Sequence, residues 1–312
     1  MNAIPFEKIA DTPAFPGEYE IVTRSVADDG TLLFLFVELE AKDAVFGTDH
    51  RPTARFVPTR MNAPTRFRLV GVRNDWHYIV DLPLLDLAYP LVDVFPDGRV
   101  LLVGRRCQWR NSEDFDLNGV ICDPASGRTS NILLGDGINR VYIDRRGLIW
   151  VAYFDEGVFG NYGWGGPGPR PIGAAGLVCF SDNGEKVWEF LAGQIADCYA
   201  LNVSGTEAVA YYYTDFPICR VSSYFRVTHW RTELRGCREL AVTRSRVLLS
   251  GQYDDPPGTG YLGTLDGDAL KGVEKVRMLL PDGSQLPEHS LLARGRHIYY
   301  FDASSVYRST LA

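Results

Sequence analysis

The sequence lacks the features of membrane-spanning and nucleic-acid-binding proteins. No apolar run approaches the length of a membrane span, and the N-terminus, MNAIPFEKIADTPAFPGEYE, has no basic start followed by an apolar stretch. Lys and Arg together number 32 against 39 Asp and Glu, which makes the net charge -7. Because nucleic acids and anionic membranes attract concentrated positive charge, we expect neither as a partner. We expect a cytoplasmic protein.

Motifs for zinc and nucleotide binding are also missing. The chain contains no CxxC pair, no nearby His spacing typical of zinc ligands and no GxxxxGK[ST] loop. The composition, 46% hydrophobic and 12% aromatic, is sufficient for a large buried core. We therefore expect a folded protein with reduced thiols that are mostly buried. The six cysteines are Cys107, Cys122, Cys179, Cys198, Cys219 and Cys237.

One unit, a polar turn followed by an apolar strand, occurs six times. Examples are FPDGRVLLVGR at 95–105, DRRGLIWVAYF at 144–154 and TRSRVLLSGQY at 243–253. Another apolar strand precedes most turns, so each turn is predicted to close a hairpin in which glycine adopts a positive φ. The turn positions are Gly30, Gly98, Gly147, Gly205, Ser245 and Gly295.

The spacing between these turns leaves room for four strands per unit. Looser strand pairs follow each repeat, as in GLVCFSDNGEKVWEF at 176–190, where Asp182-Asn183-Gly184 is a strong hairpin signal. Six four-stranded antiparallel blades predict an all-β, six-bladed β-propeller forming a single domain over 1–312. Only about two strands follow Gly295, so the segment around IPFEKIA is expected to complete the last blade and close the ring.

Two repeats resemble those of known propellers. DRRGLIWVAYFDEG resembles the repeats of NHL, YVTN and sensor-type propellers, and DNGEKVWEF is similar to an outer hairpin of quinoprotein-like and arylsulfotransferase-like propellers. The resemblance implies the β-propeller superfamily and points to no specific family. It also implies that the A-to-B turns lie on one face, while the B-to-C and D-to-A connections lie on the other, upper face.

The upper-face loops are the candidate binding region. They include long Gly-, Pro- and aromatic-containing segments, above all 155–176, which is interpreted either as a lid or as an ordered loop packed by Tyr162 and Trp164. Polar residues predicted at the upper ends of the innermost strands are Asp93, Asn139, Arg140, Asp197, Tyr199, Arg238, Glu239, Glu288 and His289. The second strands and the loops add Arg105, Asp155, Trp164, Tyr213 and Asp215 near the same rim.

Three chemical interpretations of this mixed-charge rim remain open. Carboxylates with Asn139 are suited to a divalent metal, as in regucalcin and lactonase-like propellers, although nearby arginines oppose a cation. His289 with Glu239 or Asp197 is suited to acid-base catalysis. Arg140, Arg238 and Arg105 are suited to gripping an anionic ligand, or else they neutralise acids between blades. Cys198 as a nucleophile would need a neighbouring base, and burial is the alternative.

No catalytic constellation stands out among these residues, so we expect a binding module. Its upper face would hold a small polar or anionic molecule or a protein loop, and the protein would be a monomer. The alternative is a channel-centred hydrolase or lyase, assisted by a metal or by His289 with a carboxylate. The sequence names no cofactor.

Overall fold

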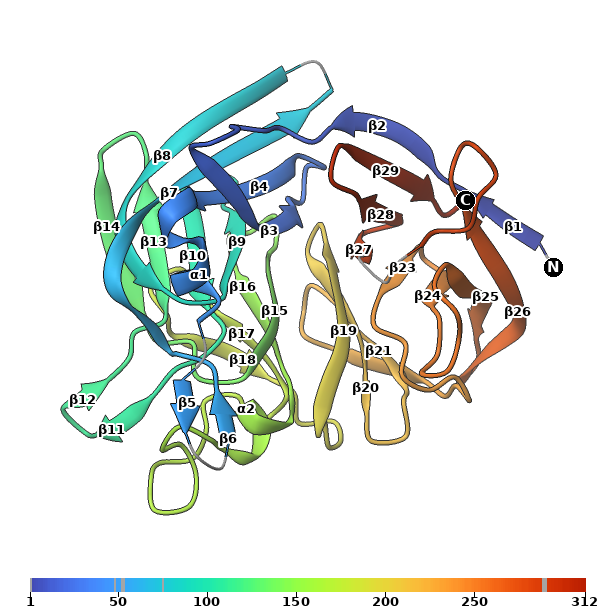
Figure 1. Cartoon of the computed structure of the whole chain (residues 1–312). Helices are drawn as coiled ribbons and strands as arrows, with labels where there is room; N and C mark the ends of the chain where they lie inside the picture. The colour runs from blue at the N-terminus through green and yellow to red at the C-terminus, as the bar shows by residue number, and fades with distance from the viewer. Residues whose placement is uncertain (1, 48, 52–53, 75, 288–290) are drawn as a thin grey trace. The chain divides into compact units, whose positions relative to one another are not determined.

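The protein is built from antiparallel sheets of consecutive strands. The computed structural model describes residues 2–47, 49–51, 54–74, 76–287 and 291–312. It has six antiparallel sheets of four strands, one of which gains a fifth strand at its edge (Figure 1). Repeated four-stranded sheets of this kind are the blades of a β-propeller, which confirms the predicted fold.

The chain divides into two compact units, Pro13–Ala196 and Met1–Thr12 with Asp197–Ala312. Each unit contains three of the blades. The single domain over 1–312 stays a prediction.

Unit Pro13–Ala196 holds blades one to three. Blade one consists of β3 (Tyr19–Val26), β4 (Leu32–Glu38), β7 (Arg60–Arg73) and β8 (Trp76–Leu87). Blade two consists of β9 (Pro90–Val94), β10 (Val100–Gly104), β13 (Gly119–Asp123) and β14 (Arg128–Ile132). Blade three consists of β15 (Ile138–Ile143), β16 (Ile149–Tyr153), β17 (Leu177–Phe180) and β18 (Lys186–Glu189).

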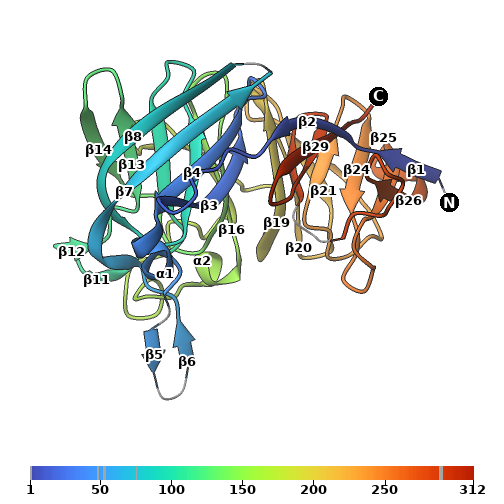
Figure 2. The same ribbon diagram turned by 45° about the horizontal axis from the view of Figure 1, so that its top comes forward.

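Short elements extend the connections of this unit. Figure 2 shows the hairpin of β5 and β6 projecting from blade one. These elements are η1 (Leu39–Ala41), α1 (Lys42–Val45), β5 (Asp49–Arg51), β6 (Ala54–Phe56), β11 (Trp109–Asn111), β12 (Asp114–Phe115) and α2 (Asp155–Phe159).

The other unit holds blades four to six. Blade four consists of β19 (Asp197–Ser204), β20 (Glu207–Tyr213), β21 (Ile218–Val221) and β22 (Val227–Trp230). Blade five consists of β23 (Leu240–Val242), β24 (Arg246–Ser250), β25 (Thr259–Asp266) and β26 (Ala269–Leu279). Blade six consists of β27 (Leu291–Arg294), β28 (His297–Phe301), β29 (Ser305–Thr310) and β2 (Glu7–Asp11).

The two ends of the chain meet in this unit. Strand β2, from the N-terminal segment, pairs antiparallel with β29 and so supplies the outermost strand of blade six. Strand β1 (Asn2–Pro5) pairs in parallel with β26 at the edge of blade five. Phe6, between β1 and β2, is buried in the core shared by blades five and six. The prediction that the N- and C-terminal strands share one blade is confirmed.

The predicted hairpin turns lie where the repeat placed them, between the first and second strand of each blade. Gly30 and Gly98 have φ of 88° and 90°, and Gly147, Gly205 and Gly295 are also in the left-handed region. A residue with a Cβ is strained there, so the glycine pattern reports the backbone shape of the turn. Gly184 in the predicted outer hairpin of blade three has a φ of 82°.

The central strands bury both of their faces. In β10, Leu101 and Val103 belong to the core between blades two and three, whereas Val100 and Leu102 belong to the core between blades one and two. Successive side chains of a strand point to opposite faces, so one strand serves two cores. The apolar runs of the repeat are therefore continuous rather than alternating.

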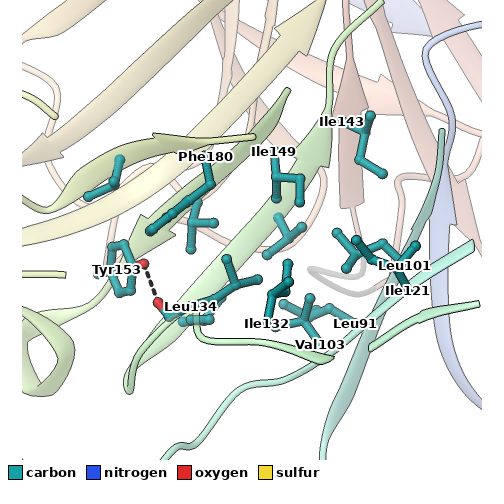
Figure 3. Packing of buried hydrophobic residues seen from close by; sticks show 14 of the residues in the cluster. Leu91, Leu101, Val103, Ile121, Ile132, Leu134, Ile143, Ile149, Tyr153 and Phe180 are labelled. Atoms are coloured by element: carbon teal, nitrogen blue, oxygen red, sulfur yellow. Dashed lines mark hydrogen bonds between the residues drawn. The ribbon is translucent and has the colours of Figure 1, made fainter. Parts of the chain in front are cut away.

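The core between blades two and three also contains a buried polar contact (Figure 3). Tyr153 is fully buried at the end of β16, and its hydroxyl donates a hydrogen bond of 2.5 Å to the carbonyl oxygen of Leu134. Leu134 lies in the connection from blade two to blade three, so this bond fixes the start of blade three against its second strand.

Replacing Tyr153 by Phe should test this contact. The buried carbonyl of Leu134 would lose its donor while the ring packing stays, which should lower the free energy of unfolding by about 1–3 kcal/mol. Urea denaturation measures the change. Tyr224→Phe is the control because Tyr224 is 85% exposed, and an equal loss in both variants would contradict the assigned role.

Candidate functional site

Several predicted residues gather at one end of blades four and five. Tyr199 lies in β19, which begins at Asp197, and Arg238 and Glu239 directly precede β23. The chain enters the innermost strand of each blade here, as the repeat predicts. Arg238 and Glu239 border a cavity in the same unit, which we call the Arg238 pocket.

The Arg238 pocket has a volume of about 320 Å³. Cavities of roughly 300–1,000 Å³ are typical of small-molecule sites. Glu239 supplies the carboxylate of the lining and Arg238 its guanidinium. The lining residues are Gly236, Arg238, Glu239, Ser250, Gly251, Gln252, Tyr253 and Leu291.

The Arg238 side chain is held by stacking rather than by an ion pair. Its guanidinium carbon lies 4.4 Å from the centroid of the Tyr199 ring. Among the residues that the structure describes, no carboxylate forms an ion pair with Arg238. Arg238 is exposed at the pocket, so its guanidinium donors face solvent. A cation stacked in this way is pre-organised to receive an anion.

Two tyrosine hydroxyls meet beside the arginine. The hydroxyl oxygens of Tyr199 and Tyr253 lie 2.5 Å apart, and either can be the donor. Burial, the hydrogen bond to Tyr253 and the nearby Asp197 raise the pKa of Tyr199, with a smaller opposing effect from Arg238. Tyr199 is therefore neutral near pH 7 and available as a hydrogen-bond donor or acceptor.

Backbone geometry positions the second tyrosine. Gly236 has a φ of 80°, and a Cβ built on it would lie 2.6 Å from the Tyr253 ring. The absent side chain lets the ring lie against the backbone before β23. The sequence does not mark either residue as part of a site, because Gly236 lies outside the repeated turn and Tyr253 is the last residue of the repeat at 243–253.

Glu239 also has a structural contact. Its side chain is 3% exposed, and its Oε2 accepts a hydrogen bond of 3.1 Å from the backbone N–H of Ala293. Ala293 lies in β27, so the carboxylate joins blade five to blade six. The hydroxyl oxygen of Ser250 accepts the backbone N–H groups of Arg238 and Glu239, at 2.8 and 3.1 Å. Ser250 thereby retains its own O–H as a donor.

Tyr213 and Asp215 do not line the Arg238 pocket. Tyr213 ends β20, is 46% exposed, and has its ring centroid 5.5 Å from that of Phe216. Asp215 borders a separate groove of about 980 Å³ together with Arg231 and Leu270. Both residues lie at the end of β20, as predicted for the rim of blade four, but their side chains lie outside the Arg238 pocket.

In the unit of blades one to three, Arg105 and Asn139 come together. Arg105 Nη1 donates a hydrogen bond of 3.2 Å to the backbone carbonyl of Asn139. Burial, with a smaller effect from Arg140, lowers the pKa of Arg105 to about 10. Arg105 therefore remains a cation near pH 7. Asp155 begins α2, where its carboxylate is exposed and accepts the N–H of Glu156 at 2.8 Å.

The predicted position of Asp93 was wrong. Asp93 lies next to the A-to-B turn of blade two, at the opposite end of β9 from the other candidates. It is fully buried, and its two carboxylate oxygens accept the backbone N–H groups of Val94 at 2.8 Å and Ile143 at 2.7 Å. Ile143 lies in β15, so Asp93 joins blade two to blade three. The prediction misplaced it because Asp93 stands five residues before the turn glycine of its blade, whereas Asn139 and Asp197 stand eight residues before theirs.

The ligand contact of Trp164 stays a prediction, but its side chain is buried. Trp164 is 6% exposed, and its indole N–H donates a hydrogen bond of 2.8 Å to the carbonyl of Cys107. A Cβ built on Gly163 would lie 2.0 Å from the carbonyl oxygen of Trp109, so the backbones touch. Of the two interpretations of the 155–176 loop, these contacts favour the packed loop.

Glu288 and His289 lie outside the described residues, so the acid-base hypothesis that uses His289 stays a prediction. Within the part of the chain that the structure describes, no three His, Cys, Asp or Glu side chains gather as a metal site would require. Over the same residues, no helix combines the length and apolarity needed to cross a membrane.

The comparisons with known proteins agree with the fold. A family model described as the YxzG family matches residues 172–309, less than half of the chain. No curated protein matches the sequence. The structure of Kuenenia stuttgartiensis hydrazine synthase is similar with a TM-score of 0.50 at 11% identity, over 96% of this chain and 97% of that chain. At this identity the likeness supports the β-propeller fold alone.

Two further structures are similar at lower scores. Virginiamycin B lyase from Staphylococcus aureus has a TM-score of 0.49 at 10% identity, over 98% of this chain and 99% of that chain. A gluconolactonase from Xanthomonas campestris has a TM-score of 0.44 at 12% identity, over 98% of this chain and 99% of that chain.

All six cysteines are buried thiols, including Cys198. Cys198 is fully buried, and its sulfur lies 3.7 Å from the carbonyl oxygen of Ala200 as a weak donor. Burial raises the pKa of Cys122 to about 11, and of Cys219 and Cys237 to about 12. It also raises the pKa of Cys107 and Cys179. The thiolate is the reactive form, so these thiols are protected.

Thiol titration should show this protection. With Ellman's reagent at pH 8, we expect none of the six cysteines to react rapidly in the folded protein. All six should react in guanidinium chloride, where burial is lost. One rapidly reacting thiol in the folded protein would contradict the burial of the set, and Cys198→Ser would show whether Cys198 is that residue.

Proposed function

We propose that the protein is a binding module that holds a small polar molecule with an anionic group in the Arg238 pocket. The observation that carries this proposal is the exposed Arg238 guanidinium, stacked on Tyr199 and without a carboxylate partner among the described residues. Placing an anion there adds charge-assisted hydrogen bonds without breaking an existing ion pair.

Neighbouring groups define the rest of such a ligand. Ser250 and Tyr253 present hydroxyls to the pocket, and Glu239 presents an acceptor. A ligand that carries an anionic group and at least one hydroxyl or amino group would satisfy both kinds of partner. In keeping with the sequence, we also propose that the protein is cytoplasmic and monomeric. A protein loop ending in an acidic side chain is the other occupant that this chemistry accepts.

Titration calorimetry on the full chain tests the binding site. The probes are L-malate, which carries carboxylates and a hydroxyl, succinate, which lacks the hydroxyl, and inorganic phosphate. We expect malate to bind better than succinate, and Arg238→Gln to weaken malate binding about tenfold or more.

Arg226→Gln is the matched control for this experiment. Arg226 is exposed and lies in the same unit, outside the lining of the pocket. Its replacement should leave the affinity unchanged. Failure of wild-type protein to bind any of the three probes would count against an anion site, as would equal binding by the Arg238→Gln variant.

An enzymatic role is the second candidate, and Glu239 is the observation that favours it. Its carboxylate borders the same pocket as Tyr253, whose hydroxyl contacts Tyr199. A carboxylate and a phenol in one cavity can accept and donate protons. The reaction would be a hydrolysis or an elimination, with or without a metal.

Turnover of p-nitrophenyl acetate by protein purified without chelator tests the hydrolytic alternative. Glu239→Gln keeps the acceptor for the Ala293 N–H but removes the base, so we expect at least about a hundredfold loss of kcat if Glu239 is catalytic. Undiminished turnover by this variant, or no turnover by the wild type, would leave binding as the preferred role.

A further inference from the structure

A second cavity lies in the unit of blades one to three, at the end where the A-to-B turns lie. It has a volume of about 540 Å³, which is ample for a small organic molecule. The A-to-B turns of all three blades contribute, together with the start of β8, the long edge strand of blade one (Figure 2). Its lining includes Asp29, Trp76, Tyr78, Val94, Phe95 and Arg145. We call this cavity the Trp76 pocket.

Aromatic rings form one wall of the Trp76 pocket. Trp76 is 58% exposed, which is unusual for so large an apolar side chain, and its ring centroid lies 5.1 Å from that of Tyr78. Phe95, from the turn of blade two, adds a third ring. Exposed indole and phenol faces carry negative electrostatic potential, which attracts cations as well as apolar groups.

The backbone of blade one is adapted to this wall. A Cβ built on Gly71 would lie 2.1 Å from the ring of Tyr78. Gly71 and Tyr78 are paired across β7 and β8, so the ring lies over the glycine. The backbone at position 71 does not require a glycine, because its φ lies outside the left-handed region. The glycine is needed for space, and that space sets the position of the Tyr78 ring.

The charges of the lining are mainly negative. Among the described lining residues, Asp28, Asp29 and Asp144 are acidic and Arg145 is basic. Asp144 is fully buried and forms an ion pair with Arg146 at 2.7 Å. Asp28 and Asp29 lie in the A-to-B turn of blade one. Arg145 pairs with Asp28 at 3.2 Å but is 71% exposed.

Asp29 influences the aromatic wall as well. It pairs with Arg73 at 2.8 Å, and Arg73 lies outside the lining. Burial, and then the charges of Asp29 and Asp93, raise the pKa of Tyr78 to about 12. Both carboxylates disfavour the anionic form of the phenol, so Tyr78 stays neutral near pH 7.

We propose that the Trp76 pocket binds a small organic cation that joins an ammonium group to an apolar or aromatic body. The apolar body would lie against Val94, Phe95 and the prolines, and the ammonium would lie at the Trp76 and Tyr78 faces near Asp29. This site is separate from the Arg238 pocket, and its ligand has the opposite charge, so the two proposals stand or fall independently.

Three probes with one common ring test the charge preference. Phenethylammonium carries the cation, 2-phenylethanol is its neutral counterpart, and phenylacetate carries the anion. Saturation-transfer NMR and calorimetry with the full chain should show the order cation, neutral, anion, with about a tenfold preference for the cation over the alcohol.

Two substitutions locate the binding. Asp29→Asn keeps an acceptor for the Thr31 N–H, which Asp29 now binds at 3.0 Å, and should weaken phenethylammonium about tenfold without affecting phenylethanol. Val94→Phe fills the cavity and should weaken both. The matched controls are Asp266→Asn, in an exposed ion pair of the other unit, and Val187→Phe, at an exposed position of β18.

Gly71→Ala provides a variant that leaves the charges unchanged. A methyl group there displaces the Tyr78 ring, so we expect weaker binding of phenethylammonium. The thermal unfolding midpoint of the same variant shows whether the fold is retained. Three results would overturn the proposal: no binding of the cation by wild-type protein, equal or better binding of phenylacetate, or a cation affinity unchanged in Asp29→Asn and Val94→Phe. An unchanged thermal unfolding midpoint in Asp29→Asn and Val94→Phe shows that weaker binding does not come from a loss of the fold.

Discussion

The central strands of each blade must bury both faces, and this constraint organises the protein. Strand β10 shows it directly, since Leu101 and Val103 serve one core while Val100 and Leu102 serve the next. A blade cannot shift its register by one residue without exchanging the two sets of side chains. Polar groups near these cores are consequently tied to the backbone of the neighbouring blade, as Asp93 is to Ile143 and Glu239 is to Ala293.

The same constraint separates structural polar residues from available ones. Asp93 resembles the other candidates in the sequence, but its two carboxylate oxygens accept backbone N–H groups in the interior. Arg238 lies in the irregular segment just before β23, where its guanidinium reaches the surface and stacks on Tyr199. Position relative to the end of a strand therefore decides which charges can meet a ligand.

Glycine contributes to the sites in two different ways. At Gly30 and Gly98 it permits a positive φ and closes a hairpin, which is a local requirement. At Gly71 it provides space for the Tyr78 ring, and at Gly236 it provides space for Tyr253 in addition to permitting a positive φ. The first kind recurs with the repeat and is visible in the sequence, whereas the second depends on a ring from another strand.

The sequence by itself determined the number of blades, their hairpin turns and the use of the N-terminal strand in the last blade. These features follow from local rules, since turn glycines and apolar strands act over a few residues. Part of the candidate site was also predictable, because Tyr199, Arg238 and Glu239 lie at strand starts marked by the repeat. Only the tertiary structure decided that Tyr253 joins Tyr199, that Trp164 is buried, and that the short turns around Asp29 surround a cavity. Those outcomes depend on packing between residues far apart in the chain, and a local pattern carries no information about which of them touch.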